Sequence, residues 1–150
     1  MHLSKPTKIQ MKVAKKLGIS LRGASQSIAA ARIYDAVEAA ISPASSPRAP
    51  TEKQVKFALD LGVYRSGDTF KVCSARIGEE LFRKNRAALR KLRLKPGDSV
   101  TKTYRVQLGD RTKEVITRHV VSSIGADLRV YFKNPGDSGG WPSQLAKVEM

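Results

Sequence analysis

The chain has little cysteine and few acidic residues. Cys73 is its only thiol, so no internal disulfide can form, and the two histidines do not stand near it at zinc-ligand spacing. Only 13 Asp and Glu residues face 28 Lys and Arg residues, which leaves a net charge of +15. A charge this far from zero indicates an anionic partner.

Long hydrophobic runs are also absent from the 150 residues, and no signal-peptide core opens the chain. The composition, with 41% hydrophobic and 27% charged residues, is that of a folded globular protein rather than a disordered one. We therefore expect a cytoplasmic protein without membrane contact, associated with the nucleoid if its source is bacterial.

An internal repeat is the most informative feature present. Residues 6–19, PTKIQMKVAKKLGI, align with residues 50–63, PTEKQVKFALDLGV, at an offset of 44, and Ala31-Arg32-Ile33 meets Ala75-Arg76-Ile77 without a gap. This pattern predicts two copies of one helical unit. In each copy a Thr-x-x-Gln capping box opens a first helix and a glycine ends it. Second helices are expected near residues 27–40 and 69–80.

The pattern Thr-x-x-Gln-x-x-x-Ala-x-x-Leu-Gly, followed by a second helix with Ala-Arg-Ile, resembles small helical modules of bacterial and phage DNA-processing proteins. The resemblance covers residues 6–41 and 50–81 and implies an accessory nucleic-acid-binding role. It carries over no catalytic residue. Because residues 64–68 differ from residues 20–24, the two copies need not bind equally.

A basic segment follows the second copy. Residues 82–95, ended by Pro96-Gly97, predict an amphipathic helix with cations on one half of its circumference and Leu81, Ala88, Leu89 and Leu92 on the other. Such a row of cations suits the phosphates of a duplex. A solvated surface helix and a membrane-surface helix are the alternatives, and the scarcity of bulky apolar residues disfavours the latter.

The last third of the chain has the alternating pattern of strands. Strands are expected at residues 100–108, 114–122, 128–132 and 145–148, with turns at Gly109-Asp110 and Gly125-Ala126-Asp127. The Lys-Pro-Gly-Asp-x-Val segment that opens this region is similar to that of many SH3-like barrels. A small antiparallel SH3-like barrel is therefore predicted.

Residues 136–140, GDSGG, resemble the nucleophile segment of chymotrypsin-like proteases. We reject that function because His119 lies in a predicted strand, because Trp141 replaces the family's proline, and because about 52 residues of strand cannot build two barrels. Residues 134–142 are instead read as a glycine-rich loop, and whether it contacts a partner stays open. Trp141 is expected to fill the barrel core or to touch a partner, and Cys73 to be a buried apolar residue.

The predicted architecture is α+β, with tandem helical repeats, a basic linking helix and a C-terminal barrel. The expected domains are repeat 1 at residues 1–42, a linker at 43–49, repeat 2 with the basic helix at 50–95, and the barrel at 96–150. The expected function is non-enzymatic nucleic-acid binding that favours duplex DNA, without cofactor or metal. The predicted binding residues are Lys12, Lys15, Lys16, Arg22, Lys56, Arg65, Arg83, Lys84, Arg86, Arg90, Lys91 and Arg93.

Two alternatives remain from the sequence. RNA binding would use aromatic residues such as Tyr131 and Phe132 to stack unpaired bases. A phage or plasmid inhibitor would instead dock its basic face on an acidic surface of a host enzyme.

Overall fold

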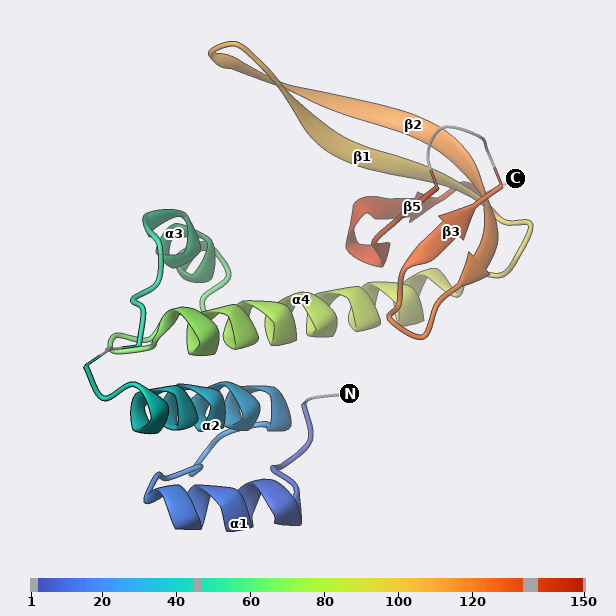
Figure 1. Ribbon diagram of the computed structural model, residues 1–150. Coiled ribbons are helices and arrows are strands. Elements are labelled where there is room, and N and C mark those ends of the chain that lie inside the picture. Colours follow the sequence, from blue (N-terminus) through green and yellow to red (C-terminus); the bar gives the residue numbers. More distant parts are fainter. Residues whose placement is uncertain (1–2, 45–46, 134–137, 150) are drawn as a thin grey trace. The chain divides into compact units, whose positions relative to one another are not determined.

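The computed structural model describes residues 3–44, 47–133 and 138–149 (Figure 1). Four helices precede a five-stranded antiparallel sheet, which confirms the α+β class. The helices are α1 (Lys8–Leu17), α2 (Gln26–Ile41), α3 (Glu52–Asp60) and α4 (Phe70–Leu92). The strands are β1 (Ser99–Leu108), β2 (Arg111–Ile124), β3 (Val130–Phe132), β4 (Gly139–Gly140) and β5 (Leu145–Lys147), with a 3₁₀ turn η1 (Pro142–Gln144) before β5. The chain divides into two compact units, and the boundary falls between Leu81 and Phe82, inside α4.

Matching capping boxes begin the first helix of each repeat. The Gln10 N–H donates to Thr7 Oγ1 at 3.1 Å and the Thr7 N–H donates back to Gln10 Oε1 at 3.0 Å. Thr51 and Gln54 exchange the same pair of bonds. Because the two first-turn donors are satisfied by side chains, the predicted helix starts are confirmed.

The bonds that join the two helices of each repeat also recur at an offset of 44. Gln10 Nε2 donates to the Gln26 carbonyl and Gln54 Nε2 donates to the Phe70 carbonyl, both at 3.1 Å. The Gln26 N–H donates to the Ser4 carbonyl at 2.9 Å, and the Phe70 N–H donates to the Arg48 carbonyl at 2.8 Å. The capping glutamine thus fixes the start of the following helix in both copies.

The two repeats meet through reciprocal hydrogen bonds between α2 and α4. Ser25, the N-cap of α2, donates to Glu79 of α4, while Thr69, just before α4, donates to Asp35 of α2 at 2.5 Å. Positions 25 and 69, and positions 35 and 79, are equivalent in the repeat. An interface in which each contact occurs twice with the partners exchanged is isologous, as in a two-fold symmetric dimer.

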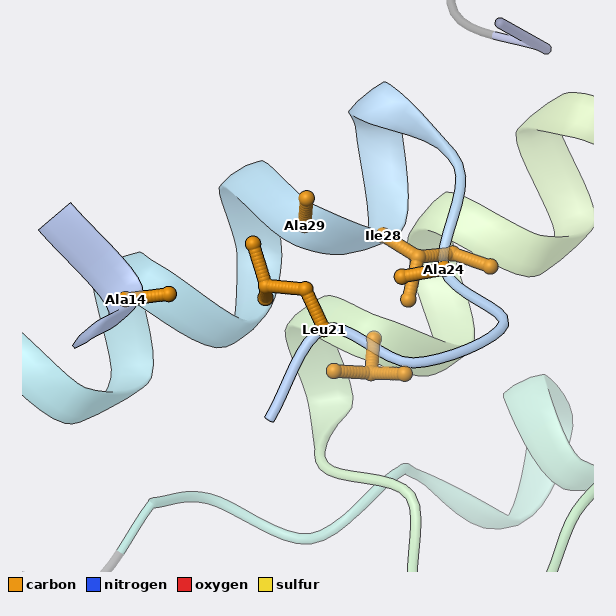
Figure 2. Close-up of a cluster of buried hydrophobic side chains, with 6 residues drawn as sticks. Ala14, Leu21, Ala24, Ile28 and Ala29 are labelled. Atoms are coloured by element: carbon orange, nitrogen blue, oxygen red, sulfur yellow. The ribbon is translucent and has the colours of Figure 1, made fainter. Parts of the chain in front are cut away.

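Small aliphatic side chains fill the core of this unit. Ala14, Leu21, Ala24, Ile28 and Ala29 cluster with Val72 (Figure 2), and a second cluster contains Ala58, Cys73 and Ile77. The second repeat thereby contributes Val72 to the core of the first. Val37 follows Ile33 at helical spacing and would be expected to share this core, yet it is 38% exposed.

α4 corrects the prediction of two separate helices. One helix of 23 residues replaces the two expected near residues 69–80 and 82–95. No proline interrupts the segment, and a side chain at Gly78 would meet only open space, so nothing there stops the helix. The helix ends at Leu92 rather than Lys95, because Arg93 adopts a left-handed conformation with φ 49°.

The sheet of the second unit is open, so the prediction of an SH3-like barrel is wrong. The strand order is β4-β3-β2-β1-β5, and β1 and β2 pair along their whole length from Ser99–Val120 to Leu108–Arg111. On the outer side of β1, β5 pairs only with Val100–Lys102, and on the outer side of β2, β3 pairs only with Val121–Ile124. The β1–β2 hairpin therefore extends as a two-stranded ribbon beyond its neighbours (Figure 1).

The sheet packs around Val100, Val121 and Val130, which are completely buried, together with Leu94, Phe132 and Leu145. Trp141 does not fill this core, since it is 38% exposed while the neighbouring Pro142 is buried. The predicted loop over residues 134–142 is also wrong in part, because Gly139–Gly140 form β4 and pair with β3. Residues 134–137 lie outside the described residues.

Candidate nucleic-acid interface

The second half of α4 presents the predicted row of cations. Arg83, Lys84, Arg86, Arg90 and Lys91 are all exposed. At about 100° per residue they occupy about 160° of the helix circumference, and they span about 12 Å along its axis. Within the part of the chain that the structure describes, Lys84, Arg86, Arg90 and Lys91 form no ion pair with an acidic residue.

The opposite side of this half-helix holds it on the sheet. Leu89 and Leu92 pack against the cluster around Val100 and Val121. Asn85 is buried, and its Oδ1 accepts a hydrogen bond from the Ser143 N–H at 3.0 Å. The cationic face is thus turned outward because apolar and amide contacts fix the other face.

Two further contacts involve arginines of this region. The Arg86 guanidinium lies 5.7 Å from the centre of the Phe82 ring, a distance compatible with a cation–π contact. Arg93 lies just beyond the helix, where its N–H still donates to the Leu89 carbonyl at 3.1 Å and its side chain is exposed.

The predicted binding residues of the first unit are likewise all exposed, but they do not form one row. Lys12 and Lys15 from α1 line a groove with Arg22 of the following loop, and Lys5 joins them. Lys5 could not be predicted as a groove residue, because it precedes the helix by three residues and belongs to no recognisable motif. Lys16, Lys56 and Arg65 lie outside this groove.

Arg76 stabilises the fold and is not available for ligand binding. It is buried, and its Nε donates to Asp68 Oδ2 at 2.6 Å while its Nη2 donates to Oδ1 at 3.4 Å. Burying this pair without satisfying its donors would be costly, so the two-point contact is structural.

The GDSGG segment has a structural explanation. Gly136 and Asp137 lie outside the described residues, and Ser138 is exposed with its carbonyl accepting from the Phe132 N–H at 3.0 Å. A Cβ at Gly139 would lie 2.4 Å from the Val130 carbonyl oxygen. Glycine is therefore required at Gly139 for the close approach of β4 to β3.

His119 and Cys73 are held inside their units. His119 is buried, stacks on Phe132 with ring centres 4.2 Å apart, and has its Nε2 2.6 Å from Thr117 Oγ1. Phe132 is thus unavailable for base stacking. Burial raises the pKa of the Cys73 thiol, which disfavours the reactive thiolate.

An exposed aromatic cluster lies elsewhere in the second unit. The Arg129 guanidinium is 5.8 Å from the Tyr131 ring centre and 5.9 Å from the Trp141 ring centre. Both Tyr131 and Trp141 are 38% exposed. Tyr131 was an expected stacking residue, whereas the contribution of Arg129 depends on a fold that brings it beside Trp141.

The described part of the chain contains neither a cluster of metal-ligating side chains nor a helix that could span a membrane. Its His, Cys, Asp and Glu side chains form no group of three that could hold a metal ion. Within the same residues, each helix is too short or too polar to cross a bilayer. Comparison with known proteins adds no further guidance, since no protein-family model, curated protein or solved structure matches the chain.

Proposed function

We propose that the protein is a non-enzymatic nucleic-acid-binding protein that favours duplex DNA. The observation that carries the proposal is the exposed cationic face of α4, whose opposite face is packed on the sheet. A helix held in this way offers guanidinium and ammonium groups at fixed spacing. The resemblance of the two repeats to helical modules of DNA-processing proteins agrees with this function.

The proposed mechanism is neutralisation of phosphates by α4 and Arg93. About 12 Å of helix corresponds to about seven phosphate charges of a duplex, at about 1.7 Å of duplex axis per charge. Phosphate contacts supply affinity and position but no sequence information. We therefore expect binding that depends little on base sequence and strongly on salt.

A titration over several salt concentrations tests this proposal. The same protein preparation is mixed with labelled duplex DNA, single-stranded DNA and structured RNA, and affinity is measured by fluorescence anisotropy. The logarithm of duplex affinity should fall steeply with the logarithm of salt, by about 0.9 per phosphate contact. A flat dependence, or no binding at low salt, would overturn the proposal and favour the inhibitor that docks on an acidic enzyme surface.

The cluster of Arg129, Tyr131 and Trp141 favours a second candidate, binding of single-stranded DNA or RNA. Exposed rings beside a guanidinium can stack an unpaired base. If this candidate is correct, Tyr131→Leu should weaken single-strand binding about tenfold, since stacking one base contributes about 1–3 kcal/mol. Duplex binding through α4 should be unchanged by that substitution.

A further inference from the structure

The first repeat contains a groove with an aliphatic floor. The groove has a volume of about 1040 Å³ and lies between α1 and the loop that leads to α2. Its floor is formed by Met11, Ala14, Ile19, Leu21 and Ala24. Three of these, Ala14, Leu21 and Ala24, also belong to the buried core (Figure 2), so the floor of the groove is continuous with the core of the repeat.

The rim of the groove is cationic. Lys5, Lys12, Lys15 and Arg22 are all exposed, and no acidic side chain lines the groove. Within the described residues none of these four cations forms an ion pair. A ligand with both carboxylates and apolar side chains would complement this surface.

The second repeat indicates that this surface is not needed for folding. The capping bonds and the glutamine-to-carbonyl bonds match between the two copies, yet the positions equivalent to Lys5, Lys15 and Arg22 carry Ala49, Leu59 and Ser66. Residues 8–17 contain four lysines and no acid, whereas residues 52–60 contain two lysines and two acids.

The floor positions differ between the copies as well. Leu21 corresponds to Arg65, and Ala24 corresponds to Asp68, which pairs with Arg76. The second copy therefore keeps the helices while placing charged groups where the first copy has apolar ones. A cationic rim around an apolar floor is specific to the first repeat.

We propose that this groove binds an acidic amphipathic peptide segment of a partner protein. Carboxylates of the peptide would pair with the four rim cations, and its apolar side chains would cover Met11, Ile19 and Leu21. A nucleic acid fits less well, because the floor contains no aromatic ring for stacking and phosphates gain nothing from aliphatic contact. The proposal goes beyond nucleic-acid binding, since it gives Lys12, Lys15 and Arg22 a different ligand from the cations of α4.

Binding of a designed peptide to the full-length protein tests the groove directly. The probe is a short fluorescent peptide of Asp, Glu, Leu and Phe whose apolar residues stand three and four positions apart, and the reference peptide contains only Asp and Glu. The probe should bind more tightly than the reference, and amide chemical shifts should change in residues 11–24. Equal affinity for both peptides, or shifts confined to other residues, would overturn the proposal.

A pair of triple variants of equal charge locates the site. Lys5→Ala, Lys15→Leu and Arg22→Ser give the groove the residues of the second repeat, which that fold already accommodates. Lys53→Gln, Lys56→Gln and Arg65→Gln remove the same charge from the second repeat. The groove variant should bind the probe about tenfold or more weakly, which corresponds to about 1.4 kcal/mol, and the control should bind nearly as well as the wild type. Equal losses would indicate general attraction between charges and not a site.

A duplex competitor separates this site from the proposed function. Duplex DNA should leave the probe on the groove, and Met11→Gln should weaken probe binding without changing duplex affinity. If the duplex displaces the probe and shifts the same amides, the groove is a nucleic-acid site and the peptide proposal fails. Failure of the nucleic-acid function would instead appear as absent duplex binding with an intact probe complex.

Discussion

Asp98 joins the end of the basic helix to the sheet through one carboxylate. Its Oδ2 accepts from the Lys95 N–H at 2.8 Å and lies 3.3 Å from the Lys147 ammonium. Pro96 and Gly97, with φ 93° at the glycine, complete the turn, and the Asp98 N–H donates back to the Lys95 carbonyl at 3.0 Å. The backbone bond from Lys95, aided by Lys147, lowers the pKa of Asp98.

The Asp98 carboxylate should stabilise the protein at neutral pH and lose this effect in acid. A carboxyl whose pKa is lower in the folded than in the unfolded state stabilises the fold above the unfolded value of about 3.9, and this contribution is lost as the pH falls through the folded pKa. Asp98→Asn should therefore be less stable than wild type at neutral pH, and the difference should shrink below about pH 4. Urea unfolding at both pH values measures it. Asp110→Asn in the hairpin turn is the control, and an equal effect of the two substitutions would contradict this role.

At the scale of single residues, the sequence predicted burial where it follows from neighbours in the chain. It did not predict contacts with residues that are distant in sequence. Cys73 was correctly predicted to be buried, because a helical Cys beside Val72 follows an apolar pattern. Of the two expectations for Trp141, the one that it fills the core was wrong, because Pro142 is the residue that is buried there. The need for glycine at Gly139 arises from the carbonyl of Val130 on β3, a neighbour that is remote in sequence.

At the level of elements, α4 belongs to two compact units. Its first half carries Val72 and Glu79 to the contacts between repeats, and its second half carries Leu89 and Leu92 to the sheet. Repetition predicted the first half and charge patterning predicted the second. The repeat gives no information about the second half of α4, and the charge pattern gives none about the first half. The sequence therefore suggested two helices where one continuous helix exists.

Removing charge from the exposed face of α4 should reduce binding without unfolding the protein. Arg86→Gln and Arg90→Gln keep good helix formers in α4, and Arg93→Gln changes an exposed side chain just beyond it. The free energy of unfolding should therefore change by no more than about 0.5 kcal/mol. If the arginines contact phosphates, the slope of duplex affinity against salt should fall by about one per contact, equally for different sequences.

The matched control for this variant lies on the sheet of the same unit. Arg105→Gln, Arg111→Gln and Arg118→Gln remove the same three charges from exposed positions of β1 and β2. These changes should leave the slope nearly intact. Equal reductions in both variants would show that net charge, and not the face of α4, determines binding.

At the scale of the whole molecule, each repeat supplies a buried carboxylate that accepts a hydrogen bond from the other repeat. The Ser25 hydroxyl accepts from the Ile28 N–H at 3.2 Å while donating to Glu79, and the Thr69 hydroxyl accepts from the Val72 N–H at 3.2 Å while donating to Asp35. One hydroxyl thus caps its own helix and binds the other copy. These pairs could not be recognised from the alignment of the two repeats. Ser25 aligns with Thr69 and Asp35 aligns with Glu79, so neither position is identical in the two copies.

The two reciprocal contacts should contribute similarly to stability. Asp35→Ala and Glu79→Ala each remove a buried acceptor, and each should cost about 1–3 kcal/mol in the free energy of unfolding. Glu38→Ala, at an exposed site on α2, corrects for the higher helix propensity of alanine. Chemical denaturation measures all three variants. A large loss in one variant and none in the other would contradict a symmetric interface.

The positions of most strands could be predicted from the sequence. Whether the strands close into a barrel or form an open sheet could not. Alternation located β1, β2 and the turns between β1, β2 and β3, because each pairs with its neighbour in sequence. Closure would have required β4 and β5 to meet, and β4 consists of only Gly139 and Gly140. Two glycines have no side-chain pattern from which a strand can be recognised.

The net positive charge also protects the open β1–β2 ribbon from aggregation, an effect that requires no ligand. Beyond Lys102 on β1 and Val120 on β2, the described residues supply no third strand, so the backbone donors and acceptors on both outer edges of the ribbon have no strand partner there. Edges of this kind recruit strands of other copies and initiate aggregation. Two approaching copies, each with a net charge of +15, repel one another before their edges meet. Colloidal stability in concentrated solution should therefore decline as salt screens that repulsion, even when every copy remains folded.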